Sequence, residues 1–503
     1  MWTSNLPTFS LGFGIFLIII GTIAVIIQPH GLIMENLLDA NLALVKGTLG
    51  FSSWAAVKLE FKVYLFHVTN PIDVQERGEV ANIVERGPYV YDELLEKTVI
   101  GTDEAADTIE YLARRTLVFN ATKSGNLSEN DEVTILNAAH VGSLITIADG
   151  FPALLSKFGN AMALLFSDPT SIFMRGRVRD ILFDGLPLVC DPKSHPELVV
   201  VCGLLKRQRP PTLRTTSEDG IYAFSFFHKI NGTYEGPMTA SRGVKDRYTI
   251  GHLSEFKGLP YADFWSIKNC SIVRGTDSIF WPPMSSRQPE VFTFINDLCR
   301  SVFAVYKNDT VYSGLLGYYY SSTKSLWNDT ESTCYCPREK KKLKCPTQGL
   351  LDLNKCQEVP IMMSEPHFLH GDESLFSITN GLQPDEEKHA TYVVVEPFTG
   401  APLSGYRKMQ LNLKLRRLKQ VHVVANVTEG MFPLLWVEEG TTPGPKILAP
   451  VILIHRTIRL LVFLSWMPLL FGIFFVAYSY WMNTSAKTEG SKASGRSTLL
   501  AVG

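Results

Sequence analysis

The 503-residue sequence predicts an α+β domain, mainly β, that is held in a membrane by one helix at each end. Two long uncharged apolar runs predict the helices, and segments that alternate between β-branched or aromatic and polar residues predict the sheet. Eight cysteines and several Asn-x-Ser/Thr acceptors indicate an oxidising compartment outside the cytosol. The formal net charge of -1 provides no basic surface for nucleic acid.

The apolar runs extend from Leu6 to Ile27 and from Leu460 to Met482, and neither contains a charged residue. Each exceeds the roughly 20 residues that a helix needs to cross a hydrocarbon core about 30 Å thick. A cleaved signal peptide is the alternative for the first run, but no Lys or Arg precedes it, and such peptides have apolar cores of only about 7–15 residues. A buried core helix is the alternative for the second run, and its length disfavours that. We expect two membrane spans.

The segment between the spans, residues 28–459, carries the features of a chain outside the cytosol. The acceptors in it are Asn120, Asn126, Asn231, Asn269, Asn308, Asn328 and Asn426, and the cysteines are Cys190, Cys202, Cys270, Cys299, Cys334, Cys336, Cys345 and Cys356. Glycosylation and disulfide formation both occur outside the cytosol. We therefore expect residues 1–5 and 483–503 to be cytosolic.

The segment between the spans is predicted to form one large domain with several strands and a helical insertion. Strand patterns cover residues 61–68, 390–398, 408–415 and 420–427, which alternate or are rich in Val, Leu and aromatic residues. Helical patterns cover residues 30–47, 151–166 and 171–186. We therefore expect a helical insertion at about residues 140–186, and a cysteine-rich region follows at residues 270–356.

The cysteine spacing alone leaves the pairing open. Cys334 and Cys336 are two residues apart, so on a strand they point to opposite faces and each needs a partner elsewhere. A zinc site that also includes Cys345 and Cys356 is the alternative. An oxidising compartment favours disulfides over such a site.

The sequence contains no motif typical of a catalytic, metal or cofactor site. It lacks G-x-S-x-G, H-E-x-x-H, the phosphate-binding G-x-x-x-x-G-K-[ST] and the dinucleotide fingerprint. His367 and His370, with Asp372 and Glu373, come closest to a set of metal ligands. Their spacing suits a metal only on a helix, which Pro366 disfavours. We predict a structural role for both histidines, and neither a catalytic residue nor a cofactor.

Several motifs resemble those of the class B scavenger receptor family, which includes platelet glycoprotein IV, the fatty acid translocase. VYLFHVTNP (residues 63–71) and ERGPYVY (85–91) resemble its N-terminal signatures. DLCRSVFAVY (297–306), CYCP (334–337), GLLDLNKC (349–356), PHFL (366–369) and VEPFTGAPL (395–403) resemble further blocks in the family order. SRGVKDRYTIGHL (241–253), LLWVEEG (434–440) and the pair Cys190 and Cys202 are most similar to the insect sensory neuron membrane proteins of that family.

The resemblance implies an antiparallel β-barrel ectodomain with a helical apex bundle and an internal hydrophobic tunnel that leads toward the bilayer. It also implies particular disulfides, namely Cys270–Cys334, Cys299–Cys356 and Cys336–Cys345. The remaining cysteines, Cys190 and Cys202, would then close a short loop beside the helical apex. The resemblance does not identify the residues that bind the ligand.

The resemblance further implies a cell-surface receptor in the plasma membrane that binds lipids, pheromones or other hydrophobic small molecules. Such a receptor would take its ligand from an extracellular carrier protein and pass it toward the membrane or an odorant receptor. A general scavenger or lipid-uptake receptor is one alternative, and a lysosomal trafficking membrane protein is another. Leu499 and Leu500 could form a lysosomal signal, but Gly495 stands where such a signal has a carboxylate.

Overall fold

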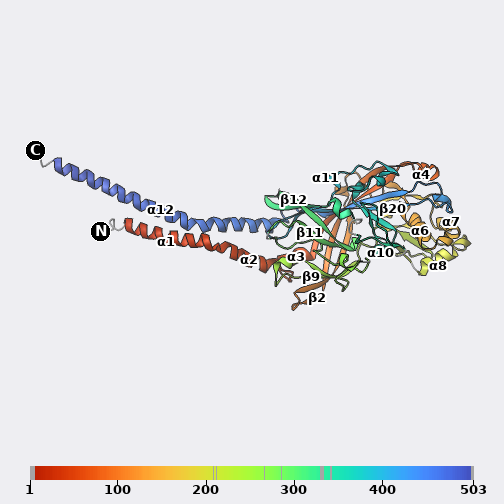
Figure 1. Cartoon of the computed structure of the whole chain (residues 1–503), viewed down its shortest axis with the longest axis horizontal. Helices are drawn as coiled ribbons and strands as arrows, with labels where there is room; N and C mark the ends of the chain where they lie inside the picture. The colour runs from red at the N-terminus through yellow and green to blue at the C-terminus, as the bar shows by residue number, and fades with distance from the viewer. Residues whose placement is uncertain are drawn as a thin grey trace. The chain divides into compact units, whose positions relative to one another are not determined.

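The computed structural model describes residues 6–207, 209–210, 212–265, 267–284, 286–328, 333–339 and 342–499. It divides into two compact units, a terminal unit formed by the two ends of the chain and a large domain, Leu42–Pro443. Figure 1 follows the chain through both units by colour. The expected cytosolic residues 1–5 lie outside the described residues.

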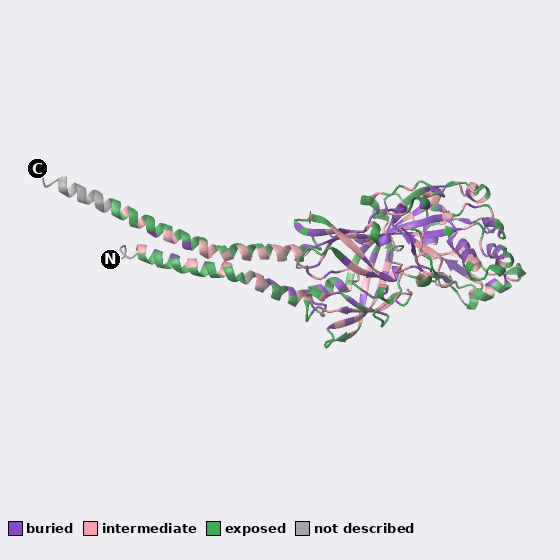
Figure 2. Ribbon diagram, in the orientation of Figure 1, coloured by how far each residue is buried: buried purple, intermediate pink, exposed green. Residues whose placement is uncertain are grey.

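The terminal unit contains α1 (Leu6–Ile27), α2 (Pro29–Leu42) and α12 (Ala449–Leu499). Both α1 and α12 are long and apolar enough to cross a membrane. Few of the described residues in either helix are buried (Figure 2), as expected of helices whose apolar side chains face lipid. The expected second span, residues 460–482, lies inside α12, which continues as a helix beyond both of its ends.

Small residues allow α1 and α12 to pack closely. A Cβ atom on Gly21 would lie only 2.4 Å from the backbone nitrogen of Leu469. Ser10 also donates a hydrogen bond from its hydroxyl to the carbonyl oxygen of Phe475, at 2.9 Å. Close backbone approach at glycine and interhelical hydrogen bonds are typical of packed membrane helices.

The large domain is built on a 14-stranded sheet in which every neighbouring pair along the main path is antiparallel. The order is β10 (Leu253–Phe256), β9 (Tyr234–Ser241), β3 (Thr108–Phe119), β2 (Ala81–Asp103), β1 (Ala56–Val68), β21 (Gly430–Thr441), β20 (Pro402–Leu415), β19 (Tyr392–Val395), β13 (Leu315–Ser321), β12 (Arg300–Tyr312) and β11 (Glu290–Ile295). β1, β19 and β20 overlap three of the strands expected from sequence.

The two edges of this path, β10 and β11, are joined by a short segment at Gly275 and Thr276. The amide of Leu253 donates to the carbonyl oxygen of Gly275 at 2.8 Å, and the amide of Phe294 donates to that of Thr276 at 2.9 Å. Gly275 has φ +80, and a Cβ there would lie 2.0 Å from the carbonyl oxygen of Phe292, so the junction requires glycine. The sheet thus forms a nearly closed barrel.

Shorter elements complete the large domain. The helices are α3 (Leu49–Ala55), α4 (Pro71–Arg77), α5 (Ala121–Ser124), α10 (Asn354–Gln357) and α11 (Glu386–His389). The strands are β4 (Glu132–Leu136), β5 (Phe173–Arg177), β6 (Leu186–Val189), β7 (Leu213–Thr215), β8 (Ile221–Phe224), β14 (Arg338–Glu339), β15 (Lys342–Leu343), β16 (Leu351–Asp352), β17 (Ile361–Ser364) and β18 (Thr379–Asn380).

A helical cap covers one end of the large domain, where α6 (Ala138–Gly150), α7 (Leu155–Ala163) and α8 (Val199–Arg207) lie together (Figure 1). The side chain of Asn137 caps α6 by accepting a hydrogen bond from the amide of His140 at 3.0 Å. Apolar residues of α6 and α7 share a buried cluster with strand residues such as Leu413 and Phe432. The predicted α+β class, with a barrel, a helical bundle and two terminal helices, is confirmed.

Two predicted elements are wrong. Residues 171–186 do not form one helix, because Phe173–Arg177 pairs as β5 with β4, and only Asp180–Asp184 makes a short helical turn. The helices of the cap therefore end with α7 at Ala163, earlier than expected, and a further cap helix, α8, follows later in the chain. Residues 420–427 form no strand but a turn with a 3-10 helix at His422–Val424. Their alternating valines are buried against the cap, and Asn160 of α7 accepts a hydrogen bond from the amide of His422.

Four disulfides contain all eight cysteines, so none is left as a zinc ligand. They are Cys190–Cys202, Cys270–Cys334, Cys299–Cys356 and Cys336–Cys345, the pairs that the family resemblance implies. Each bridge joins residues that are Cα–Cα 4.5 to 6.2 Å apart. Three of the four connect segments of the cysteine-rich region, residues 270–356, to one another.

Candidate ligand-binding cavity

A cavity of about 560 Å³ lies inside the large domain, between the helical cap and one end of the barrel interior. This volume falls within the roughly 300–1,000 Å³ that sites for small molecules occupy. Its walls come from all three cap helices, from β1, β20 and β21 of the sheet, and from the segment that follows Cys356. The cavity therefore joins residues that lie hundreds of positions apart in the sequence.

Most of the cavity wall is apolar. The cap contributes Phe151, Leu154, Phe158, Met162, Leu204 and Leu205, and the barrel contributes Phe61, Met363, Met409, Leu411, Leu413 and Val437. Small residues of α6, among them Ala139 and Gly142, leave the space open on the cap side. A wall of this composition favours a long apolar ligand, since each buried methylene contributes about 0.8 kcal/mol.

Strand alternation explains how β20 supplies its part of the wall. Met409, Leu411 and Leu413 occupy every second position and face the cavity. Gln410 and Asn412 face the other way and are fully buried, and the Gln410 side-chain amide donates to the Asn412 side-chain oxygen at 2.8 Å. Hydrogen bonds from β20 to the neighbouring β17 thus support the apolar wall from behind.

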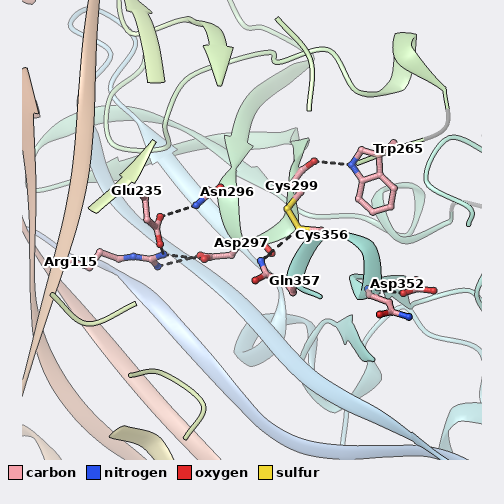
Figure 3. Close-up of a disulfide and its surroundings, with 10 residues drawn as sticks. Arg115, Glu235, Trp265, Asn296, Asp297, Cys299, Asp352, Cys356 and Gln357 are labelled. Atoms are coloured by element: carbon pink, nitrogen blue, oxygen red, sulfur yellow. Dashed lines mark hydrogen bonds and ion pairs between the residues drawn. A yellow bond between two sulfur atoms is a disulfide. The ribbon is translucent and has the colours of Figure 1, made fainter. Parts of the chain in front are cut away.

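Charged residues form one end of the cavity, which we call the charged floor: Arg115, Asp297, Glu439, and the adjoining Arg407, Glu235 and Glu93. Arg115 is the centre of this group. Its two terminal nitrogens donate to the Asp297 carboxylate at 3.0 and 3.2 Å, and one of them also donates to Glu235 at 2.9 Å (Figure 3). Such bidentate pairing fixes the guanidinium orientation.

Arg407 provides the second guanidinium of the charged floor. It donates to Asp297 at 3.1 Å and is also paired with Glu439. Burial alone would raise the pKa of Asp297, but the two neighbouring guanidiniums hold it below its ordinary value. Burial alone would lower the pKa of Arg115, but Asp297, Glu235 and Glu439 hold it well above its ordinary value.

Glu93 of β2 is the most deeply buried member of the charged floor, with 2% of its surface exposed. Neither of its carboxylate oxygens has a hydrogen-bond partner among the described residues. Burial raises the pKa of Glu93 well above its ordinary value, and the carboxylate of Glu439 adds to this.

The sheet register places these charges at one level of the barrel. Arg407 of β20 is the direct cross-strand partner of Glu439 on β21, and Phe61 of β1 is the partner of Glu439 on its other side. Val437 and Met409, two residues away on the same strands, are also partners and line the apolar wall. The apolar wall and the charged floor are thus only two residues apart along the same strands.

The disulfide Cys299–Cys356 secures the charged floor. Asp297 lies on a 3-10 turn, Asn296–Leu298, directly before Cys299. The side-chain amide of Gln357, next to Cys356, donates to the backbone carbonyl of Asp297 at 2.9 Å (Figure 3). Gln357 also lines the cavity, so the bridge connects the floor to the side wall.

We expect replacement of Cys299 and Cys356 by serine to destabilise the large domain by about 4 kcal/mol, because the bridge closes a long loop. The two residues are 57 positions apart in the chain. Thermal unfolding of the purified full-length chain measures the effect. A variant without Cys336–Cys345, with a separation of only 9 residues, should lose less. Equal losses in the two variants would contradict the loop-length argument.

His367 and His370 lie outside the cavity wall and contact different partners. The His367 ring pairs with Glu85 through Nε2 at 2.7 Å, and its Nδ1 accepts from the amide of Gln383 at 2.9 Å. His370 pairs with Glu365 at 2.6 Å, and this hydrogen bond raises the pKa of His370 against the effect of burial. Among the described residues, no group of three or more His, Cys, Asp and Glu side chains could hold a metal ion.

We expect His367→Gln and His370→Gln to lower stability while leaving any transport activity within about twofold of the parent chain. The His367 ring stacks on His389 with 4.3 Å between centroids, and its loss leaves Glu85 with one fewer partner. Losing one partner of a buried polar pair costs about 1–3 kcal/mol. Unfolding curves and ligand delivery, measured side by side, check this. Loss of delivery at unchanged stability would indicate a chemical role for the pair.

The seven glycosylation acceptors all lie in the large domain, and none lines the cavity. Asn126, Asn269, Asn308 and Asn426 are exposed. Asn120, Asn231 and Asn328 are half-buried, and the side chain of Asn231 accepts a hydrogen bond from the amide of Leu117 at 3.0 Å. Their modification stays a prediction.

Comparison with known proteins identifies the family. A sequence model of the CD36 family matches residues 12–482. Sensory neuron membrane protein 2 of Heliothis virescens is 34% identical over 443 residues, which cover 86% of this chain and 84% of the relative. The protein of the same name from Manduca sexta is 34% identical over 462 residues, covering 89% and 88%. Sensory neuron membrane protein 1 of Apis mellifera is 31% identical over 443 residues, covering 87% and 84%.

These matches extend over nearly the whole chain, including both apolar terminal helices. They agree with the family motifs described in the sequence. The resemblance to the class B scavenger receptors, with the sensory neuron membrane proteins as similar relatives, is confirmed. The chain belongs to the CD36 family and is a two-span membrane receptor.

Proposed function

We propose that this receptor binds a long-chain hydrophobic ligand in the cavity of the large domain and passes it toward the membrane. The observation that carries the proposal is the apolar cavity of about 560 Å³ beneath the helical cap. The receptor uses no catalytic residue, metal or cofactor, since transfer of an apolar molecule breaks no bond. The names of its relatives support a role in an insect sensory neuron, where the ligand would be a pheromone or odorant passed toward an odorant receptor.

The physical value of such a cavity lies in avoiding exposure to water. A chain of about 16 carbons loses on the order of 12 kcal/mol when it leaves apolar surroundings for water, at about 0.8 kcal/mol per methylene. A cavity lined by Phe, Leu and Met side chains replaces most of those lost contacts. An extracellular carrier protein could then release its ligand without a large barrier.

Delivery of a labelled long-chain alcohol from a soluble carrier protein into cells tests the proposal. Cells that display the receptor should accumulate the label faster than cells that do not, and more so when the carrier is in excess. Accumulation that is the same in both cells, at verified surface display, would show that the receptor does not transfer such ligands. A general lipid-uptake receptor would be distinguished by expression of the chain outside sensory tissue.

We propose that the large domain lies outside the cell and that both termini are cytosolic. Glycosidase treatment should then reduce the apparent mass of the protein by several sugars. Tags at either terminus should stay inaccessible to antibody in intact cells and become accessible after permeabilisation. Staining of an N-terminal tag in intact cells would contradict this orientation, and a tag inserted in an exposed loop of the large domain serves as the positive control.

A further inference from the structure

The charged floor gives the cavity an asymmetry that the apolar wall alone would not have. Arg115, Asp297 and Glu439 line one end of the cavity, whereas the opposite side is formed by cap residues such as Phe151 and Leu154. A long amphiphile in this cavity would place its chain against the cap and its polar terminus near the floor. The chemistry of the floor then decides which terminus is accepted.

Both guanidiniums of the floor are already engaged by carboxylates. Arg115 donates with both terminal nitrogens, to Asp297 and to Glu235, at 2.9 to 3.2 Å. Arg407 donates to Asp297 and is paired with Glu439. An incoming carboxylate would therefore have to displace an internal carboxylate in order to bind either guanidinium.

The charge balance of the charged floor also disfavours the binding of a carboxylate. Two guanidiniums face three carboxylates, those of Asp297, Glu235 and Glu439, before Glu93 is counted. Glu93, whose carboxyl oxygens have no partner among the described residues, offers no cation to an incoming anion. The floor thus has an excess of negative charge in a poorly hydrated place, where an additional anion is repelled more strongly than in water.

We propose that the charged floor makes the receptor select uncharged long-chain amphiphiles, such as alcohols, and reject the corresponding fatty-acid anions. This inference rests on the proposed function, because it assumes that the ligand occupies the cavity. A hydroxyl terminus can donate a hydrogen bond to a floor carboxylate and carries no charge to be repelled. A carboxylate terminus finds no unengaged cation and an excess of like charge.

Photolabelling of the full-length receptor in phosphatidylcholine nanodiscs tests the selection. The probes are a long-chain alcohol and a carboxylic acid of equal length, each with a diazirine at the same carbon. A pH of about 8 keeps the acid ionised, since an ordinary carboxyl pKa is about 4. A long-chain sulfonate, which stays ionised at lower pH, is a second anion. Labelled cavity peptides are identified by mass spectrometry and quantified.

We expect the alcohol to label cavity peptides about tenfold more than either anion, the ratio that one net like charge about 12 Å away produces at an effective dielectric constant of about 20. Glu439→Gln should lower the ratio of alcohol to anion labelling, because it removes one negative charge and leaves Arg407 with Asp297 as its remaining carboxylate partner in the floor. Glu235→Gln should act in the same direction while leaving Arg115 bonded to Asp297, and it is informative even if Glu439→Gln folds poorly.

Glu438→Gln is the matched control, because Glu438 is the sequence neighbour of Glu439 but does not line the cavity and pairs with Lys62 and Lys408. The control variant should show the same ratio of alcohol to anion labelling as the parent chain. Equal labelling of the cavity by alcohol and acid in the parent chain would overturn the selection, and so would a ratio unchanged in both floor variants. Absence of cavity labelling by every probe would instead overturn the proposed function, and the selection with it.

Discussion

Gly142→Trp is expected to reduce ligand delivery by roughly tenfold or more at unchanged surface display. Gly142 lies on α6 and lines the cavity. A Cβ atom at this position would approach only Pro360, at 3.5 Å, which is ordinary van der Waals contact. The backbone therefore tolerates a side chain, and the indole projects into the space that the ligand would use. Displacing it costs about 1–3 kcal/mol, and about 1.4 kcal/mol is a factor of ten.

Gly203→Trp provides a matched control for this prediction. Gly203 lies on α8, another cap helix, but it is exposed, does not line the cavity, and has no atom within 4 Å of a Cβ built on it. The same side chain is thus added to the same cap without entering the cavity. Delivery by this variant should equal that of the parent chain. If Gly142→Trp also delivers normally, the ligand does not pass through the cavity.

Local sequence patterns were sufficient to predict the elements that do not depend on a distant pairing partner. The two spans were predictable because an uncharged run of that length has few other stable locations. β1 and β20 were predictable because apolar and polar residues alternate along much of residues 61–68 and along all of residues 408–415. The helix predicted for residues 171–186 was wrong because their apolar spacing also suits a helix. The backbone hydrogen bonds of Phe173–Arg177 are instead made with β4, some 40 residues earlier. A pairing partner at that distance cannot be read from a local pattern.

The charged floor could not be predicted from the sequence for a different reason. Four of its five strand residues stand beside another charged residue: Asp92 precedes Glu93, Arg114 precedes Arg115, Lys408 follows Arg407 and Glu438 precedes Glu439. Adjacent strand residues point to opposite faces, so one member of each pair must point inward. The sequence does not say which one, because the strand register depends on the closed barrel. Two adjacent charges in a strand were the only available signal.

The cavity itself was implied by resemblance, but its lining residues were not. The walls combine α6 and α7, the later helix α8 and strands from both ends of the large domain. Helix α8 had no place in the expected apex, which ended at residue 186. The sequence thus indicated a mainly β receptor domain with an apolar interior, whereas the position and chemistry of the site depend on contacts between distant segments.

Arg115→Ala is expected to lower the free energy of unfolding of the large domain by about 3–5 kcal/mol, the usual effect of removing one partner from a buried ion pair. The Arg115 side chain is only 9% exposed, and its removal leaves Asp297, Glu235 and Glu439 close to one another without their shared cation. Arg407 remains, but it also contacts Asp297 and Glu439 and cannot replace the bonds to Glu235. Little protein should mature to the cell surface.

Arg114→Ala is the control, because it removes the neighbouring arginine side chain of β3, which lies outside the charged floor. Arg114 faces the other side of β3 and pairs with Glu96 at 2.7 Å in a setting where both side chains are more than a third exposed. Screened pairs of this kind contribute little, so Arg114→Ala should unfold like the parent chain. Adding Asp297→Asn to Arg115→Ala should recover part of the lost stability, because it removes one of the unpaired negative charges. If the double variant is no more stable than Arg115→Ala, the loss arises from packing, and the electrostatic account of the charged floor is wrong.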